Sequence, residues 1–261
     1  MSGSLKGTVA VVTGAAGGIG AATCAVLMES GARVVASDLA STPAEKRPAG
    51  AEWVPLDVTS EADWERLVAE VERQHGRLDI LVNNAGISVV EPLEGSSLET
   101  WRKVMAVNVD SLYLGVRACL PLLKKSGARR KGGASIVNLS SNAGLIGAEF
   151  NVAYCTSKGA VRLMTKAMAM EFSALRYPVR VNSVHPGGVD TGMLSAIFER
   201  YHELGFAPSA QAAYDASVAA HPIGRMGQPE EIAAGIRFLA SDESSNMHGA
   251  ELVLDGGYTA R

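Results

Sequence analysis

A glycine-rich turn near the start of the chain joins an apolar, strand-like run to an alanine-rich segment. The run 8–12, TVAVV, is rich in β-branched residues and predicts a buried strand, and the segment after the turn predicts a helix that ends at Gly31. Gly14, Gly18 and Gly20 carry no side chains where the chain turns, so a pyrophosphate can approach the backbone and the helix N-terminus. The spacing is GxxxGxG rather than the common GxGxxG, and an ordinary tight strand-to-helix loop is the alternative interpretation.

An acidic residue closes the next strand-like run. The run ARVVASD ends at Asp38, eighteen residues after Gly20, which is close to the spacing of a carboxylate that binds an adenosine ribose. The charge of Asp38 would repel a 2′-phosphate, and neither Gly17 nor Leu39 supplies a compensating cation. The pattern therefore predicts NAD rather than NADP as the cofactor.

Strand-like runs and helical patterns alternate along the chain. RVVAS, AEWVPL, DILVNN, ASIVNLS, VRVNSV and AELVLD have strand character, whereas 60–75, 97–125 and 151–175 have helical periodicity. The alternation predicts an α/β fold in a single domain over 1–261, with a Rossmann-like, doubly wound parallel sheet of about seven strands and helices on both faces. The segment 193–222 has no place in the alternation and is predicted to form a helical flap over the site.

Three side chains suit proton transfer at an alcohol or carbonyl oxygen. Tyr154 and Lys158 are four residues apart in AYCTSKGA, which places a phenol and an ammonium on one helix face. A nearby cation favours the phenolate and so lowers the pKa of a phenol. Ser141, thirteen residues before the tyrosine, adds a hydroxyl. The arrangement is typical of general acid/base chemistry and would need a hydride carrier to complete an oxidation or reduction.

Composition excludes several other classes of protein. The chain has 261 residues, of which 47% are hydrophobic and 20% charged, as in soluble globular proteins. Its net charge of −3 argues against a surface that binds nucleic acid. The chain has three cysteines, Cys24, Cys119 and Cys155, which is an odd number, and their spacing is not that of metal ligands. We therefore expect reduced thiols in a cytoplasmic protein, and no metal site. The uncharged segment 7–28 resembles a membrane span, but its glycines and its strand-to-helix pattern argue against one.

The run 124–131 contains five basic residues and could dock an acidic carrier protein. It precedes a predicted strand, at the amino ends of the sheet, whereas ligands bind at the carboxyl ends. A solvated loop is therefore the preferred interpretation.

The chain resembles the single-domain short-chain dehydrogenases/reductases over nearly its whole length. The motifs that carry the resemblance stand in the order of that family: TGAAGGIG from Thr13, Asp57, NNAG from Asn83, Asn108, Ser141, YCTSK from Tyr154 and HPGGVDT from His185.

The resemblance implies roles for four residues. Tyr154 is the expected acid/base, and Lys158 is expected to lower its pKa and to hold the nicotinamide ribose. Ser141, rather than the adjacent Ser140, is expected to bind the substrate oxygen, and Asn108 to position a water that relays protons to Lys158.

The resemblance and the glycine turn together imply a set of cofactor contacts. Asp57 and Val58 are expected near adenine, and the NNAG motif can also stabilise the end of the central strand. The expected cofactor-binding residues are Gly14, Gly17, Gly18, Ile19, Gly20, Asp38, Leu39, Asp57, Val58, Asn84, Ala85, Gly86, Tyr154, Lys158, Pro186, Gly187, Val189 and Thr191. His185 looks catalytic by type, but it has no acid or nucleophile partner in the sequence and is expected to be structural.

The flap carries apolar residues at helical spacing, which predicts a cover for an apolar substrate. A wall from Ala143 to Phe150 is expected opposite, with Glu149 as the only nearby charge. The expected substrate contacts are Ser141, Ala143, Glu149, Phe150, Tyr154, Met193, Ile197 and Phe198. Such a pocket favours a compact hydrophobic secondary alcohol, alicyclic or steroid-like, and its ketone over sugars or carboxylates.

Two other functions fit the same fold. One is a carrier-linked 3-ketoacyl reductase, and the other is a non-catalytic nucleotide-binding protein. The intact set of Asn108, Ser141, Tyr154 and Lys158 argues against the second. The family resemblance also implies a homotetramer.

Overall fold

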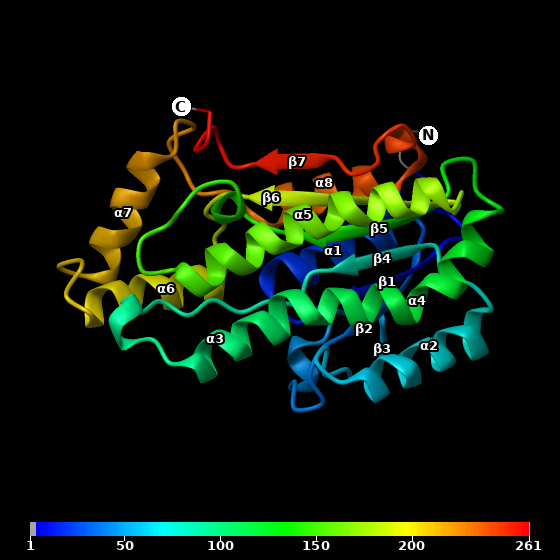
Figure 1. Cartoon of the computed structure of the whole chain (residues 1–261), viewed down its shortest axis with the longest axis horizontal. Coiled ribbons are helices and arrows are strands. Elements are labelled where there is room, and N and C mark those ends of the chain that lie inside the picture. Colours follow the sequence, from blue (N-terminus) through cyan, green and yellow to red (C-terminus); the bar gives the residue numbers. More distant parts are fainter. Residues whose placement is uncertain (1–3, 261) are drawn as a thin grey trace.

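A seven-stranded parallel sheet forms the centre of the protein, whose computed structural model describes residues 4–260 (Figure 1). The strand order is β3-β2-β1-β4-β5-β6-β7, and every neighbouring pair is parallel. The order reverses between β1 and β4, which places the switch point of a doubly wound sheet beside the glycine-rich turn. The predicted fold class is confirmed. The strands are β1 (Val9–Thr13), β2 (Arg33–Ser37), β3 (Glu52–Trp53), β4 (Ile80–Asn83), β5 (Ala134–Leu139), β6 (Val179–Pro186) and β7 (Glu251–Leu254).

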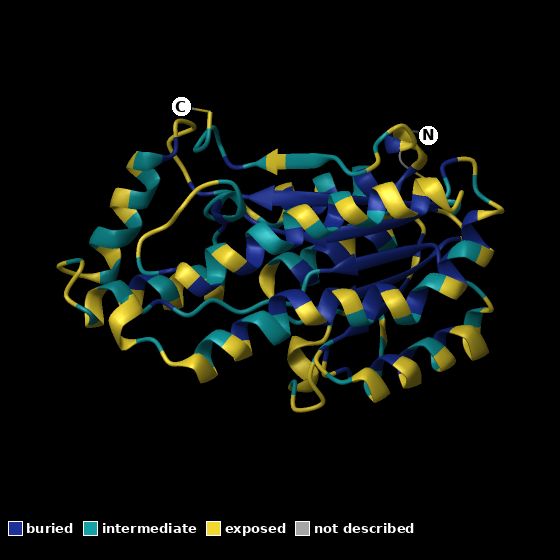
Figure 2. Ribbon diagram, viewed as in Figure 1, coloured by how far each residue is buried: buried dark blue, intermediate teal, exposed yellow. Residues whose placement is uncertain are grey.

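Helices cover both faces of the sheet, and two further helices project beyond its carboxyl end (Figures 1 and 2). The buried residues divide into two clusters, one under α2, α4 and α5 and the other under α1 and α8. Helices α6 and α7 lie outside this layering, at the end of the sheet where ligands bind in such folds. The helices are α1 (Gly18–Glu29), α2 (Glu61–His75), α3 (Leu98–Met105), α4 (Ser111–Gly127), α5 (Val152–Ala174), α6 (Gly192–Glu203), α7 (Ala210–Ala220) and α8 (Pro229–Ala240).

The segment 97–125 is not the single regular helix that its periodicity predicts. A π-helical stretch, Ala106–Asp110, separates α3 from α4. Within it the buried Asn108 exchanges hydrogen bonds with Ile87, which lies beyond the end of β4. The wider turn brings this amide toward the sheet, and π-helical turns often occur at functional sites.

Two segments of the chain are apolar enough to suggest a membrane. The segment 7–28 folds instead as β1, the glycine turn and α1. Leu98–Gly127 is long and apolar enough to cross a membrane, but half of its most apolar window is buried inside the protein. Its packing against the sheet accounts for this composition.

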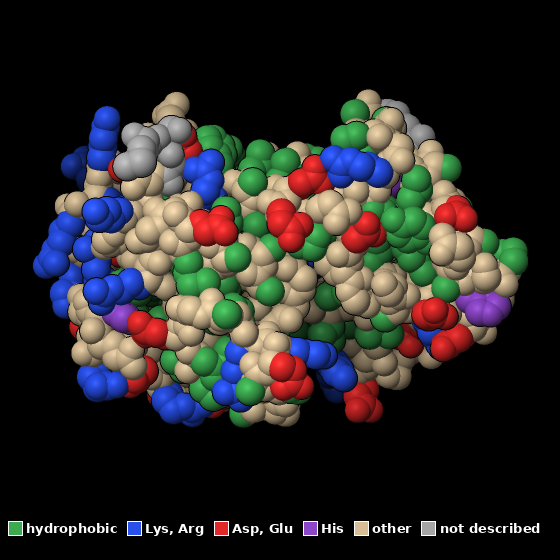
Figure 3. Space-filling view, turned by 180° about the vertical axis from the view of Figure 1, so that it is seen from behind, with side chains coloured by type: hydrophobic (Ala, Val, Ile, Leu, Met, Phe, Trp, Pro, Cys, Tyr) green, Lys and Arg blue, Asp and Glu red, His purple; other side chains and the backbone are tan. Residues whose placement is uncertain are grey.

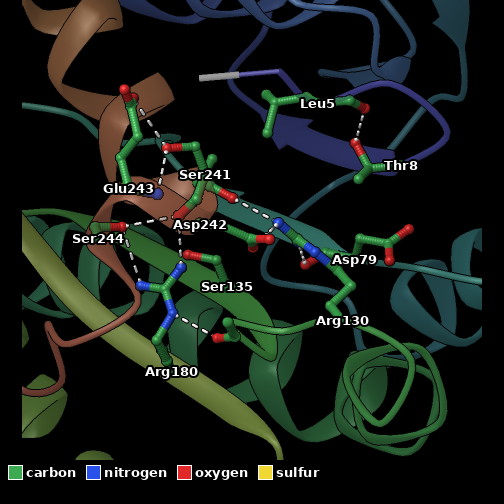
Figure 4. Close-up of polar contacts among 12 residues, drawn as sticks. Leu5, Thr8, Asp79, Arg130, Ser135, Arg180, Ser241, Asp242, Glu243 and Ser244 are labelled. Atoms are coloured by element: carbon green, nitrogen blue, oxygen red, sulfur yellow. Dashed lines mark hydrogen bonds and ion pairs between the residues drawn. The ribbon is translucent and has the colours of Figure 1, made fainter. Parts of the chain in front are cut away.

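The basic run 124–131 is only partly the solvated loop that we expected. Lys and Arg side chains gather at this end of the molecule, opposite α6 and α7 (Figure 3). Arg130, however, is largely buried and donates hydrogen bonds to Asp242 and to the carbonyls of Asp79 and Ala240 (Figure 4). The last carbonyls of a helix lack partners within the helix, and Arg130 supplies one at the end of α8.

Arg180 of β6 occupies a buried site beside Arg130 (Figure 4). Its guanidinium donates to the Gly132 carbonyl at 2.7 Å and to the Leu239 and Ser241 carbonyls at 3.1 Å each. Burial and the charge of Arg130 lower the pKa of Arg180 to about 10, so it remains charged at neutral pH. The amino end of the sheet is therefore held together by two arginines that bind backbone carbonyls.

Candidate active site

Steric contacts account for the glycines between β1 and α1. Gly14 has a φ of +62°, and a Cβ there would lie 2.8 Å from the Ala85 Cα. A Cβ on Gly18 would lie 2.6 Å from Thr191 Cγ2, and one on Gly20 would overlap the Gly14 carbonyl. Larger residues would clash with the protein at these positions, so only glycines allow this close turn between a strand and a helix N-terminus, an arrangement that fits a dinucleotide.

Asn84 braces this turn from the end of β4. Its amide donates to the carbonyls of Thr13 and Gly14 at 2.9 and 3.0 Å. The Thr13 hydroxyl in turn accepts hydrogen bonds from the backbone of Asn84 and Ala85. Asn84 of the NNAG motif thus ties the end of β4 to the end of β1 and to the glycine turn.

Asp38 lies across the turn from the end of β2. Its two carboxylate oxygens accept hydrogen bonds from the backbone of Ala16, at 3.1 Å, and of Leu39, at 2.8 Å. The carboxylate therefore stands beside the turn, where an adenosine ribose would follow the pyrophosphate.

Asp57 and Val58 follow β3. The Asp57 carboxylate accepts hydrogen bonds from the backbone N–H and the hydroxyl of Thr59, and Val58 is buried.

Tyr154, Lys158 and Ser141 meet above the carboxyl ends of β4 and β5. Tyr154 and Lys158 lie one turn apart on α5, and the Lys158 Nζ is 5.6 Å from the centre of the Tyr154 ring. Ser141, two residues after β5, lies close enough to the Tyr154 phenol to affect its pKa, and its hydroxyl donates to Asn142 Oδ1 at 3.1 Å. The neighbouring Ser140 instead donates to the Lys158 carbonyl at 2.8 Å, away from the phenol. Geometry therefore favours Ser141 over Ser140 as the substrate-binding hydroxyl.

Burial dominates the ionisation of these groups. It raises the pKa of Tyr154, and the interaction with Ser141 opposes this shift. Burial also lowers the pKa of Lys158 to about 8. The expected lowering of the phenol pKa by Lys158 is absent in the protein alone, because the ammonium donates to the Leu139 carbonyl at 2.8 Å rather than to the phenol.

Asn108 reaches the same region through the π-helical stretch. Its amide oxygen accepts from the Ile87 backbone at 2.8 Å, and its nitrogen donates to the Ile87 carbonyl and to Ser157. A Cβ on Gly86 would lie 3.3 Å from the Asn108 oxygen and 3.4 Å from the Lys158 Nζ. Asn108 and Lys158 thus approach Gly86 from two sides.

The segment after β6 forms the other side of the site. His185 is buried between Ser183 and the Ser141 carbonyl, and burial lowers its pKa, in keeping with a structural role. Gly187 packs against the backbone of Asp255, which excludes a side chain there. Thr191 caps α6 through its hydroxyl. Pro186 is the last residue of β6, and Val189 is buried.

Two hollows flank α6, one on each side. One of about 280 Å³ is lined by Ser88, Val89, Val90, Met193, Ala196, Ile197 and Arg200. The other, of about 320 Å³, is lined by Asp190, Thr191, Gly192, Leu194, Ser195, Phe198 and Tyr214.

The structure corrects the expected substrate pocket in two respects. Phe198 does not share a surface with Met193 and Ile197, because it is buried against α7 with its ring 5.9 Å from that of Tyr214. Glu149 is not the only nearby charge, since Arg200 lines the hollow beside Met193 and Ile197. Ala143 is buried beside Ser141, whereas Glu149 is exposed.

Several residues of this region had no signal in the sequence. Gly188 donates its backbone N–H to the buried His221, and a Cβ on Gly188 would touch Met226. Asn151 and Arg200 belong to no motif in the sequence, so only their partners identify them. Among residues 4–260 no group of three or more His, Cys, Asp or Glu side chains could hold a metal ion.

Comparison with known proteins agrees with the fold and the site. The profile of the family described as Enoyl-(Acyl carrier protein) reductase matches residues 14–259. Taken with the parallel sheet, the glycine turn and the Ser141, Tyr154 and Lys158 arrangement, this match shows that the chain belongs to the short-chain dehydrogenase/reductase family.

Relatives with named activities span the full chain. A cyclopentanol dehydrogenase of Comamonas sp. is 42% identical over 99% of both chains. An NADP-dependent (R)-specific alcohol dehydrogenase of Lentilactobacillus kefiri is 38% identical over 100% of both. The ligand-free structure of an aldohexose dehydrogenase from Thermoplasma acidophilum has a TM-score of 0.87 and 32% identity, covering 98% of this chain and 96% of that one. The protein is therefore an alcohol oxidoreductase that uses a nicotinamide cofactor and acts on small molecules.

Proposed function

We propose that the protein is an NAD-dependent dehydrogenase that interconverts a compact, hydrophobic secondary alcohol and its ketone. The observation that carries the proposal is the position of the Tyr154 phenol, beside Ser141 and one turn from Lys158, at the sheet edge that bears the glycine turn.

The three side chains divide the work of the reaction. NAD, when bound, supplies the acceptor for the hydride. Ser141 holds the substrate oxygen by a hydrogen bond. Tyr154 takes the hydroxyl proton during oxidation and returns it during reduction. Lys158, whose ammonium donates to the Leu139 carbonyl, would hold the nicotinamide ribose once NAD is bound, and its charge would favour the phenolate in that complex. Asn108 anchors this region and orients a water toward Lys158.

The choice of NAD follows from Asp38. Its carboxylate is fixed by Ala16 and Leu39 beside the glycine turn, and no Lys or Arg follows it before Lys46. A 2′-phosphate there would meet a like charge, whereas ribose hydroxyls would meet an acceptor. Because a relative from Lentilactobacillus kefiri is NADP-dependent, measuring which cofactor this enzyme prefers tests the proposal directly.

The hollow beside Met193 and Ile197 supports the substrate class. Val89, Val90 and Ala196 make most of the lining apolar, with Ser88 and Arg200 as its polar members, and such a lining suits a ring better than a polyol. The cyclopentanol dehydrogenase relative points the same way. We also propose a homotetramer in the cytoplasm, supported by the exposed Leu163 and Met170 on α5 and by three free cysteines.

The decisive experiment follows NADH formation across a panel of alcohols. We expect activity on cyclopentanol, cyclohexanol or a hydroxysteroid, and little on an aldohexose. Preference for an acyl thioester with NADPH would instead identify a carrier-linked reductase. Cofactor binding without turnover of any alcohol or ketone would identify a nucleotide-binding protein. Sedimentation of the purified protein tests the tetramer.

A further inference from the structure

Phe150 adopts a backbone conformation that large side chains rarely take. Its φ is +57°, and among the described residues Arg176 is the only other non-glycine with a positive φ. Arg176 lies in an exposed turn after α5, but Phe150 lies directly before that helix, four residues ahead of Tyr154. Such strain persists only where the surroundings compensate for it, and it is common at clamps around ligands.

Aromatic contacts with the end of α6 supply that compensation. The Phe150 ring stacks on Phe206, with 3.6 Å between ring centres and 6° between planes. It also meets the edge of Tyr201 at 6.3 Å. Both partners belong to the flap at the end of the sheet. The strained residue therefore joins the flap to the segment that leads into the catalytic helix.

Asn151 adds a polar connection at the same place. This side chain is buried, and although it stands at the N-terminus of α5 it does not cap that helix. Its amide nitrogen donates to the Tyr201 hydroxyl at 3.2 Å, and its oxygen accepts from Ser88 at 3.2 Å. The Tyr201 hydroxyl also donates to the Glu149 carbonyl. The flap, the segment after β4 and the start of α5 thus meet at Asn151.

Tyr201 lies on the same stripe of α6 as the residues that line the substrate hollow. Met193, Ile197 and Tyr201 follow one another at intervals of four, so they share one face of the helix. The first two line the hollow beside Val89 and Val90, and the third is held by Phe150 and Asn151. Holding Tyr201 therefore fixes the distance between Ile197 and the opposite wall.

We propose that Phe150, Asn151, Tyr201 and Phe206 form a latch that holds α6 closed and limits the size of the alcohol admitted to the hollow. Tyr201 and Phe206 act as positioning residues, because they set the place of Met193 and Ile197 rather than the chemistry at Tyr154. The proposal rests on the proposed function, in which this hollow takes the alcohol.

Phe206→Ala tests the latch through specificity. Losing the stacked ring should raise KM for cyclopentanol about three- to tenfold, while kcat and the dissociation constant of NADH change less than about twofold. The ratio of kcat/KM for a hydroxysteroid to that for cyclopentanol should rise, because a loosened α6 admits a larger ring. A ratio that stays unchanged, as it would if both alcohols lost kcat/KM equally, would overturn the proposal. Leu98→Ala, at a more exposed apolar residue on α3, is the matched control and should leave KM unchanged.

A pair of substitutions at Phe150 tests the strain without any assay of activity. Phe150→Gly and Phe150→Ala both remove the ring, but only glycine is relaxed at this φ. The glycine variant should melt about 3 °C above the alanine variant. An alanine variant that melts at the same or a higher temperature would show that Phe150 is not strained. If no alcohol is oxidised by the native enzyme, the proposed function fails, and this melting comparison still decides whether the strain exists.

Discussion

The Lys158 ammonium lies 5.6 Å from the centre of the Tyr154 ring, yet its hydrogen bond goes to the Leu139 carbonyl at the end of β5. The cation is thereby fixed relative to the sheet rather than to the phenol. It can stay in place while the phenol gains or loses a proton.

Tyr154→Phe removes the group that we assign to proton transfer. Turnover should fall by about 10²- to 10⁴-fold, as is usual on losing a general acid/base, because the ring remains and only the hydroxyl is lost. The dissociation constant of NADH, measured by fluorescence titration, should change little. A variant that keeps more than about a tenth of native activity would show that another group moves the proton. Lys158→Ala should impair both turnover and cofactor binding.

The rate should depend on pH in opposite senses for the two directions. Oxidation needs the Tyr154 phenolate, whereas reduction needs the phenol, and burial raises the pKa of this group. Oxidative kcat/KM should therefore increase with pH above neutrality, and reductive kcat/KM should decrease. Ser141→Ala removes the interaction that opposes the rise in the Tyr154 pKa. The midpoint of its oxidative pH profile should therefore lie at higher pH than that of the native enzyme. Ser140→Ala, whose hydroxyl binds the Lys158 carbonyl, is the control and should leave the midpoint in place.

Asp38→Ala should narrow the preference for NAD over NADP. The substitution removes the charge that would repel a 2′-phosphate, and also one hydrogen bond to Ala16 of the glycine turn and one to the adjacent Leu39. We expect kcat/KM with NAD to fall and kcat/KM with NADP to rise, which initial rates with each cofactor can measure. A native enzyme that uses NADP as well as NAD would contradict the assignment of Asp38.

Glu251 should stabilise the fold only above acidic pH. Burial raises the pKa of this carboxyl, but hydrogen bonds from Arg162 and Lys166 outweigh that effect and bring the pKa to about 2. The usual value is 4.5, so the stabilisation is complete above that pH and is lost as the pH falls toward about 2. The difference in melting temperature between the native protein and Glu251→Gln should therefore shrink across this acidic interval. A difference that does not vary with pH would show that the ion pairs do not carry it.

Arg180→Met should weaken the fold without changing the chemistry. The buried Gly132 carbonyl would lose its donor, whereas the Leu239 and Ser241 carbonyls keep hydrogen bonds from Ser135 and Ser244. A buried carbonyl left unpaired costs about 1–3 kcal/mol, so the free energy of unfolding in urea should fall by about that amount. The kcat of the folded variant should stay native, since Arg180 lies at the amino end of the sheet. Arg129→Met, at the exposed neighbour of Arg130, should change stability by less than about 0.5 kcal/mol.

The features that sequence predicted well are the local ones. The glycine turn, the one-turn spacing of Tyr154 and Lys158 and the alternation of strands and helices depend on residues close together in the chain. The π-helical stretch could not be predicted, because Asn108 takes its partner 21 residues away at Ile87. Arg130 was misjudged for the same reason, since its carbonyl partner on α8 is 110 residues distant. The aromatic contacts of Phe150 likewise depend on a fold that brings the flap back to α5.

The separation of the two ends of the sheet has a consequence for laboratory evolution of this enzyme. Arg130 and Arg180 fasten the amino end, far from α6 and α7 (Figures 1 and 4). A library that randomises Val89, Met193 and Ile197, none of which is buried, therefore leaves the contacts that stabilise the sheet in place. Variants from such a library should diverge in the alcohols they accept while keeping similar melting temperatures, which gives the scaffold unusual tolerance to selection for new substrates.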